Sequence, residues 1–263
     1  FSVSLVTKVP KQKSVKTQKK PKKTYQIPKI NINYNFKTQC IQLLKLSQFY
    51  VKSLLKETSF WAIAICGIII ILINSVNLGT VYDVDSYPAT YFIVEELQEM
   101  SMYFFIIILI FYSGELIWKE RAVKLNLIYD ATSISDTIAL TSKFIALIVI
   151  YIVLMLSLIA TGILFQVANG YYQFELDVYF FGFFVEILPF LILYTFVAFF
   201  FQAISNNKFV GIFLVLLFFI ANIASEHVGF QHSLYKFGGK TLGTYSEMNG
   251  YGHFLQPYLW IKT

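Results

Sequence analysis

The sequence predicts an all-α integral membrane protein with five transmembrane helices, the start of a sixth, and an N-terminal amphipathic surface helix. Of its 263 residues, 57% are hydrophobic and only 14% are charged, and the mean hydropathy is +0.62. These values are too apolar for an ordinary soluble domain. The apolar residues gather into runs long enough to cross a bilayer, and most of the positive charge precedes the first run.

The N-terminal part of the chain is strongly basic. Thirteen of the 21 Lys and Arg residues come before Glu57, and that stretch contains no acidic residue. Residues 1–35 have no sustained apolar period and contain three prolines, so we expect a largely disordered linker. A basic run of this kind could bind nucleic acid, but next to apolar spans we favour contact with anionic membrane lipids and expect no nucleic acid. The positive-inside rule then puts the N-terminus in the cytoplasm.

Residues 36–58 are predicted to form an amphipathic helix at the membrane surface. Leu43, Leu46, Tyr50 and Leu54 recur at roughly helical spacing between lysines. The alternative is a soluble helix that packs on a protein partner.

Residues 59–263 form the predicted transmembrane region. The five spans are expected at about 59–77, 92–118, 144–167, 178–203 and 207–225, with a cytoplasmic loop at 119–143 and an external loop at 226–257. A sixth apolar run begins at Tyr258. Because the sequence starts at Phe1 and stops within this run, we expect a longer polypeptide.

Acidic residues in two of the spans are candidates for a substrate or gating site. Glu95 and Glu99 share one face near the start of the second span, where they either bind a ligand or simply complement the helix dipole. Glu186 lies inside the fourth span, where an ionised carboxylate costs a few kcal/mol unless it faces protein or water. The alternative is that Pro189 breaks the helix and Glu186 marks a re-entrant turn.

The sequence lacks the motifs of a metal or nucleotide enzyme. Glu226, His227 and His232 do not form a zinc signature, so we expect no metal and no cofactor. Gly239-Lys240-Thr241 matches the end of a phosphate-binding loop, but Leu234 stands where its first glycine belongs. We therefore expect no catalytic residues, and any ATPase activity would belong to a partner.

The polar end of the second span carries a family resemblance. The run FYSGELIWKERAVKLNLIYDATSISD, residues 111–136, resembles the span-to-loop junction of bacterial ABC type-2 exporter permeases, in particular two-part permeases fused to an aminopeptidase N-like zinc peptidase. The stretches GYYQFE, NNKFVGIF, EHVGFQHSLYKF and YSEMNGYGHFLQP also look similar, and the resemblance runs from about Gln26 to the end. Related sequences often have a proline-containing DALP where this chain has Asp130-Ala131-Thr132-Ser133.

This resemblance implies one permease half in the bacterial inner membrane, working with an ATP-binding cassette subunit and a second permease half. The residues it implies in coupling to the ATPase are Glu115, Lys119, Glu120, Arg121, Asp130 and Asp136. One alternative is a membrane scaffold that anchors a C-terminal peptidase domain. Another is an ion-coupled carrier that uses Glu95, Glu99 and Glu186.

Overall fold

The computed structural model describes residues 35–74, 80–81, 84–85, 89–122, 124, 134–227, 237–238, 245, 248 and 250–262. Several predicted features lie outside these residues: nearly all of the basic linker, Asp130, His232, Leu234 and the Gly239-Lys240-Thr241 run. Most of the external loop predicted at 226–257 is also outside them.

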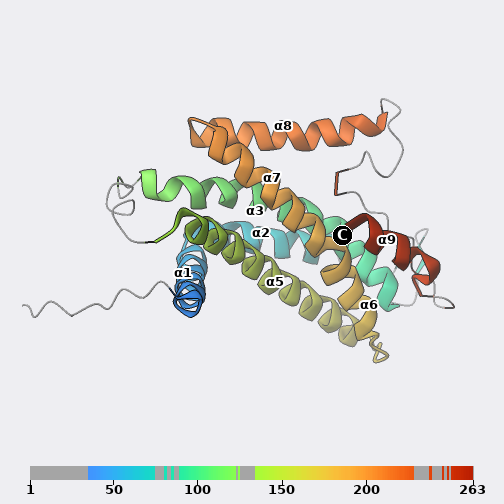
Figure 1. The fold of residues 1–263 in the computed structure, drawn as a ribbon. Helices are drawn as coiled ribbons and strands as arrows, with labels where there is room; N and C mark the ends of the chain where they lie inside the picture. The colour runs from blue at the N-terminus through green and yellow to red at the C-terminus, as the bar shows by residue number, and fades with distance from the viewer. Residues whose placement is uncertain are drawn as a thin grey trace, which may run out of the picture. The chain divides into compact units, whose positions relative to one another are not determined.

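The described part of the chain is almost entirely helical (Figure 1). Its helices are α1 (Phe36–Leu55), α2 (Thr58–Asn74), α3 (Thr90–Ala122), α5 (Asp136–Ala168), α6 (Leu176–Phe180), α7 (Leu188–Ile204), α8 (Lys208–His227) and α9 (Leu255–Lys262). A π-helical turn, η1 (Phe181–Ile187), joins α6 to α7, and a 3-10 turn, η2 (Gly252–Phe254), precedes α9. The short strands β1 (Thr80–Val81) and β2 (Val84–Asp85) pair in an antiparallel hairpin.

Four of these helical segments are long and apolar enough to cross a membrane. They are α3, α5, the continuous segment Leu176–Ile204, and α8 from Lys208 to Ser225. The first predicted span coincides with α2, an apolar helix of 17 residues from Thr58 to Asn74. Four of the five predicted spans therefore correspond to helices that are long and apolar enough to cross a membrane. Helix α3 begins at Thr90, two residues before the predicted start of the second span.

The end of α5 shows how local sequence sets a helix boundary. Gly170 has φ +75°, a backbone conformation that suits glycine, directly after Asn169. The N–H of Tyr171 donates to the carbonyl of Gln166 at 2.9 Å, and the N–H of Gly170 donates to that of Val167 at 3.1 Å. This pair of bonds is the Schellman arrangement that closes a helix C-terminus. The Asn-Gly pair thus stops α5 at Ala168.

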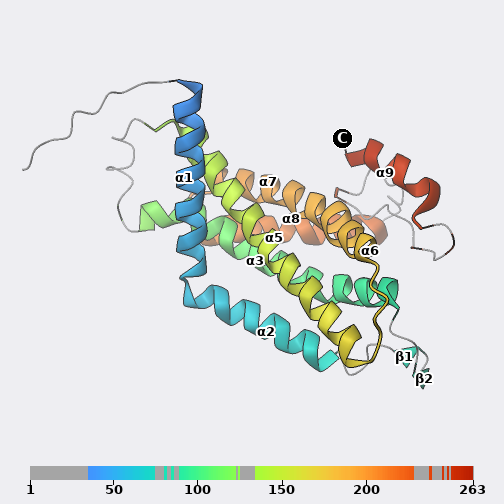
Figure 2. The same ribbon diagram turned by 90° about the horizontal axis from the view of Figure 1, so that it is seen from below.

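The core lies where α3, α5 and α7 pack together (Figure 2). Phe105 and Tyr151 meet edge to face with ring centroids 6.4 Å apart. The Tyr151 hydroxyl is fully buried and shares a hydrogen bond of 3.1 Å with Thr195 Oγ1. Polar groups inside the apolar core are thereby paired, which offsets the cost of removing them from water.

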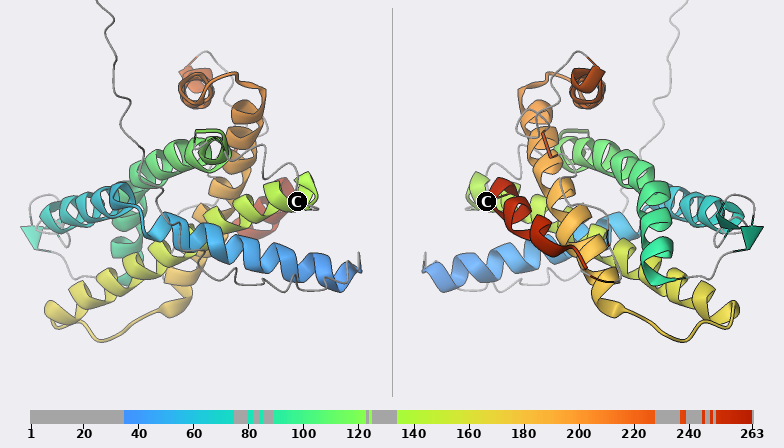
Figure 3. Two further views of the ribbon diagram at one scale, coloured as in Figure 1. Left: turned by 90° about the vertical axis from the view of Figure 1, so that its left-hand side faces the viewer. Right: turned by 90° about the vertical axis from the view of Figure 1, so that its right-hand side faces the viewer.

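Helix α1 packs against α5, and α8 lies on α7 and α3, beyond α7 as seen from α1 (Figure 3). The predicted surface helix is present, with Tyr50 and Leu54 buried in the bundle. The same helix also exposes Phe36, Ile41, Leu44 and Phe49. The helix is therefore apolar toward the protein and partly apolar away from it, which fits both the membrane surface and a protein partner.

Two predicted details differ from the structure. Helix α3 continues to Ala122 and α5 already begins at Asp136, so both helices extend into the loop predicted at 119–143. The alternative in which Pro189 breaks the fourth span is not what the structure has, because the chain stays helical from Leu176 to Ile204. The π-helical turn just before Pro189 accommodates the proline without ending the helix.

Candidate functional site

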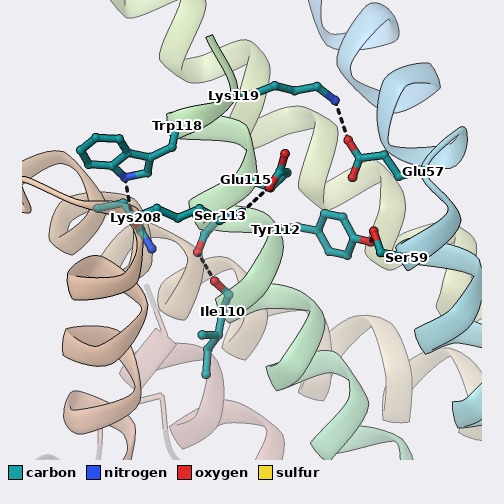
Figure 4. A network of polar contacts seen from close by, with 10 residues as sticks. Glu57, Ser59, Ile110, Tyr112, Ser113, Glu115, Trp118, Lys119 and Lys208 are labelled. Atoms are coloured by element: carbon teal, nitrogen blue, oxygen red, sulfur yellow. Dashed lines mark hydrogen bonds and ion pairs between the residues drawn. The ribbon is translucent and has the colours of Figure 1, made fainter. Parts of the chain in front are cut away.

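The last turns of α3 hold three ion pairs, each with a different part of the bundle. Lys119 Nζ lies 2.5 Å from Glu57 Oε1, in the turn between α1 and α2 (Figure 4). Lys143 Nζ, on α5, lies 2.8 Å from Glu120 Oε2. Glu115 pairs with Lys208, the first residue of α8 (Figure 4). Three residues of one helix thus connect to three other segments.

The Glu120 pair is the most enclosed of the three. The Lys143 side chain is 8% exposed, and Glu120 also accepts a hydrogen bond of 2.5 Å from the Tyr50 hydroxyl on α1. The Lys143 ammonium lies 5.5 Å from the centre of the Tyr50 ring, a cation–π distance. These three side chains form a triad that joins α1, α3 and α5. Because Lys143 is buried, loss of its carboxylate partner would leave an uncompensated charge.

The other two pairs are partly open to solvent. Lys119 donates to Ser53 Oγ at 2.8 Å as well as to Glu57, so it holds the end of α1. The Lys208 ammonium lies 5.0 Å from the centre of the Phe111 ring in addition to its pair with Glu115. Side chains exposed by about a quarter to a third gain only modest energy from such pairs, roughly 0.5–1 kcal/mol each. They connect α3 to the α1–α2 turn and to α8.

A buried amide packs α3, α7 and α8 together beside these pairs. Trp118 Nε1 donates to Gln202 Oε1 at 2.9 Å, and Gln202 is 1% exposed. Gly114 and Gly211 leave room for this side chain, since a Cβ at Gly211 would lie 2.2 Å from Gln202 Oε1 and one at Gly114 would lie 2.9 Å from its Nε2. Within the described residues, Gln202 Nε2 has no hydrogen-bond partner.

The structure therefore brings together three of the six predicted coupling residues: Glu115, Lys119 and Glu120. Arg121 is exposed, with its guanidinium 5.0 Å from the centre of the Trp118 ring. Asp136 is exposed in the first turn of α5 and is in none of the three pairs. Asp130 lies outside the described residues.

Sequence reasoning missed the partners of these residues. Tyr50, Glu57, Lys143 and Lys208 were not among the candidate residues. One signal was available: a lysine at position 143, directly before a long uncharged run, requires a counterion if it is buried.

The second predicted site, the acidic residues Glu95, Glu99 and Glu186, is only partly brought together. Glu95 and Glu99 lie on α3, and Glu186 lies in the turn η1. Glu186 is 8% exposed and accepts a hydrogen bond of 3.1 Å from Gln98 Nε2, which also donates to the Gly182 carbonyl at 2.7 Å. Glu186 therefore faces protein, one of the arrangements expected for it. Glu95 and Glu99 are exposed on α3.

Near Glu186, Pro189 leaves one helical carbonyl without its usual backbone donor. Pro189 has no N–H, so the carbonyl of Val185, four residues earlier, lacks its usual helical donor. The Tyr258 hydroxyl, from α9, donates to that carbonyl at 2.5 Å.

The fold and the four long apolar helices define a multi-pass membrane protein. Comparison with protein-family models, curated proteins and solved structures finds no match to this chain. Among the described residues, no group of three or more His, Cys, Asp or Glu side chains could hold a metal ion.

Proposed function

We propose that this chain is one half of the permease of an ATP-driven ABC exporter in the bacterial cytoplasmic membrane, with its N-terminus in the cytoplasm. An ATP-binding subunit and a second permease half would complete the transporter. The observation that carries the proposal is the set of three ion pairs at Glu115, Lys119 and Glu120. They lie within the stretch 111–136 that resembles the ATPase-contacting junction of such permeases.

A coupling element must pass a small displacement to several helices at once. A push on the residues after Ala122 would move the end of α3. Through its ion pairs, that end would carry with it the α1–α2 turn, α5 and α8. Packed helices respond to such a push as rigid rods that shift by one or two ångströms. With 33 residues, α3 is about 50 Å long and reaches from this junction to the opposite half of the bundle.

The first test is to isolate the protein from its native membrane in mild detergent and to identify the copurifying proteins by mass spectrometry. The proposal expects an ATP-binding subunit in stoichiometric amount, together with ATPase activity. A chain that purifies without such a subunit would contradict the proposal and favour the peptidase scaffold.

A charge reversal at an exposed residue tests coupling without disturbing the fold. Arg121→Glu is expected to uncouple ATP hydrolysis from transport, because Arg121 is exposed at the end of α3 and takes part in none of the three ion pairs. Asp177→Lys is the matched control, an exposed charge reversal in the first turn of α6. Normal coupling in Arg121→Glu, with normal amounts of inserted protein, would remove this segment from the mechanism.

A further inference from the structure

A pocket of about 680 Å³ lies between α3, α7 and α8, and its α3 lining residues run from Glu96 to Ile106, before the residues that form the ion pairs. A volume of this size suits a drug-sized organic molecule. The wall contributed by α3 includes Glu96, Glu99 and Tyr103, and α7 and α8 contribute Phe190, Tyr194 and Phe219. The pocket thus combines carboxylates with aromatic rings.

The charge of this pocket is one-sided. Glu96 and Glu99 are three residues apart and therefore lie on the same face of α3. None of the described residues that line the pocket is Lys, Arg or His. Glu95, although adjacent in sequence, is exposed and is not part of the lining. The two lining carboxylates consequently present negative charge that no basic residue of the described lining neutralises.

The opposite wall is aromatic and fixed in place. Phe190 and Tyr194 have ring centroids 4.4 Å apart, and Tyr194 and Phe219 have centroids 5.7 Å apart. Asn222 donates to the Tyr194 hydroxyl and, at 2.9 Å, to the Phe237 carbonyl, while the Phe237 N–H donates to Asn222 Oδ1 at 3.3 Å. These bonds tie α7, α8 and Phe237 together, so the wall is organised before any ligand arrives.

We propose that this pocket binds amphipathic organic cations, molecules with one positive charge on a bulky apolar body. The positive charge would be held by Glu96 and Glu99, and the apolar body would lie against the Phe190, Tyr194 and Phe219 rings. Aromatic faces attract cations as well as apolar groups. A bare metal ion fits less well, because the described residues offer no cluster of three metal-ligating side chains. This binding site does not depend on the proposed ATP-driven function.

The test uses two probes of the same shape and opposite charge. Tetraphenylphosphonium is the cation and tetraphenylborate the anion, and binding of each to the purified chain in detergent is measured by isothermal titration calorimetry. The proposal expects saturable binding of tetraphenylphosphonium. Binding is expected to weaken about tenfold in the double variant E96Q/E99Q, equivalent to about 1.4 kcal/mol. The same double variant should bind tetraphenylborate no more weakly than the original chain.

Matched variants separate a specific site from general attraction to an acidic surface. E95Q removes an equal charge from the same helix outside the pocket and should change the tetraphenylphosphonium affinity less than twofold. F219L removes an aromatic ring but keeps an apolar side chain, and it should weaken cation binding severalfold. Non-saturable uptake of both ions, or an equal loss in E95Q and E99Q, would overturn the proposal. The exposed position of Glu99 makes the single variant E99Q a usable test even if E96Q disturbs folding.

Discussion

The hydroxyl of Tyr50 donates a hydrogen bond of 2.5 Å to Glu120, although the two residues are 70 positions apart in the sequence. The second oxygen of the same carboxylate holds the buried Lys143. One acidic side chain at the end of α3 therefore joins a helix predicted at the membrane surface to the transmembrane bundle. Among the residues of the three ion pairs on α3, Glu120 is therefore the one whose loss should lower stability most.

Replacing Glu120 with Gln should destabilise the protein because it leaves the Lys143 ammonium without its counterion. We expect a loss on the order of 2 kcal/mol in the free energy of unfolding, below the value for a fully buried pair because Glu120 is partly exposed. Thermal unfolding in detergent measures it. The double variant Glu120→Gln, Lys143→Met removes both charges and should recover part of the loss. Equal destabilisation in the single and double variants would show that the unpaired Lys143 charge does not cause the loss.

Reversing the pair at the start of α8 should be tolerated only when both residues change. Glu115→Lys places two cations together and should lower stability, and so should Lys208→Glu with its two carboxylates. The double variant restores opposite charges. We expect a coupling energy of roughly 1 kcal/mol from the double-mutant cycle, since both side chains are about a quarter exposed. Additive losses would mean that the two residues do not interact in the membrane.

Gly211→Ala should loosen the packing of α8 on α7. The new methyl group would lie 2.2 Å from Gln202 Oε1 and 2.7 Å from Ser205 Oγ, so neighbouring atoms must move. Overpacking of this kind costs about 1–3 kcal/mol, measurable by thermal unfolding. Gln202→Ala removes the side chain that the new methyl group would meet. In that background Gly211→Ala should therefore cost less free energy of unfolding than it does in the original protein.

Gly170→Ala is the matched comparison for that variant. A Cβ at Gly170 would meet nothing within 4 Å, but the residue has φ +75°. Its cost is therefore conformational, about 1 kcal/mol, and Gln202→Ala should leave it unchanged. If Gln202→Ala relieved both glycine variants equally, the relief would not come from local space.

The sequence was sufficient for the helices and insufficient for the contacts between them. Long apolar runs located α3, α5 and α8, because membrane length and hydropathy are local properties of the chain. The partners of Glu115 and Lys119 lie 93 and 62 residues away in the sequence. A local sequence pattern cannot predict contacts between residues so far apart in the chain. The close approaches at Gly114 and Gly211 were also invisible, since these glycines lie on different helices and form no repeated small-residue motif.

Pro189 shows where a local rule predicts the wrong outcome. Proline inside a helix removes one hydrogen bond, and this suggested a break in the fourth span. The structure instead widens the preceding turn, in which the Leu188 N–H donates to Phe183, five residues back. The remaining carbonyl, that of Val185, is satisfied by Tyr258 from α9. A distant side chain thus supplies the missing donor, and only the folded chain brings it there.

The last prediction follows from this substitution of donors. Tyr258→Phe removes only the hydroxyl and should lower the free energy of unfolding by about 1 kcal/mol, because the Val185 carbonyl loses its donor. Pro189→Ala supplies a backbone N–H four residues after Val185, so the loss caused by Tyr258→Phe should be smaller in that background. Thermal unfolding of the four proteins in this cycle measures the difference. An undiminished loss in the Pro189→Ala background would mean that Tyr258 acts through its other contacts and not by replacing the missing helical donor.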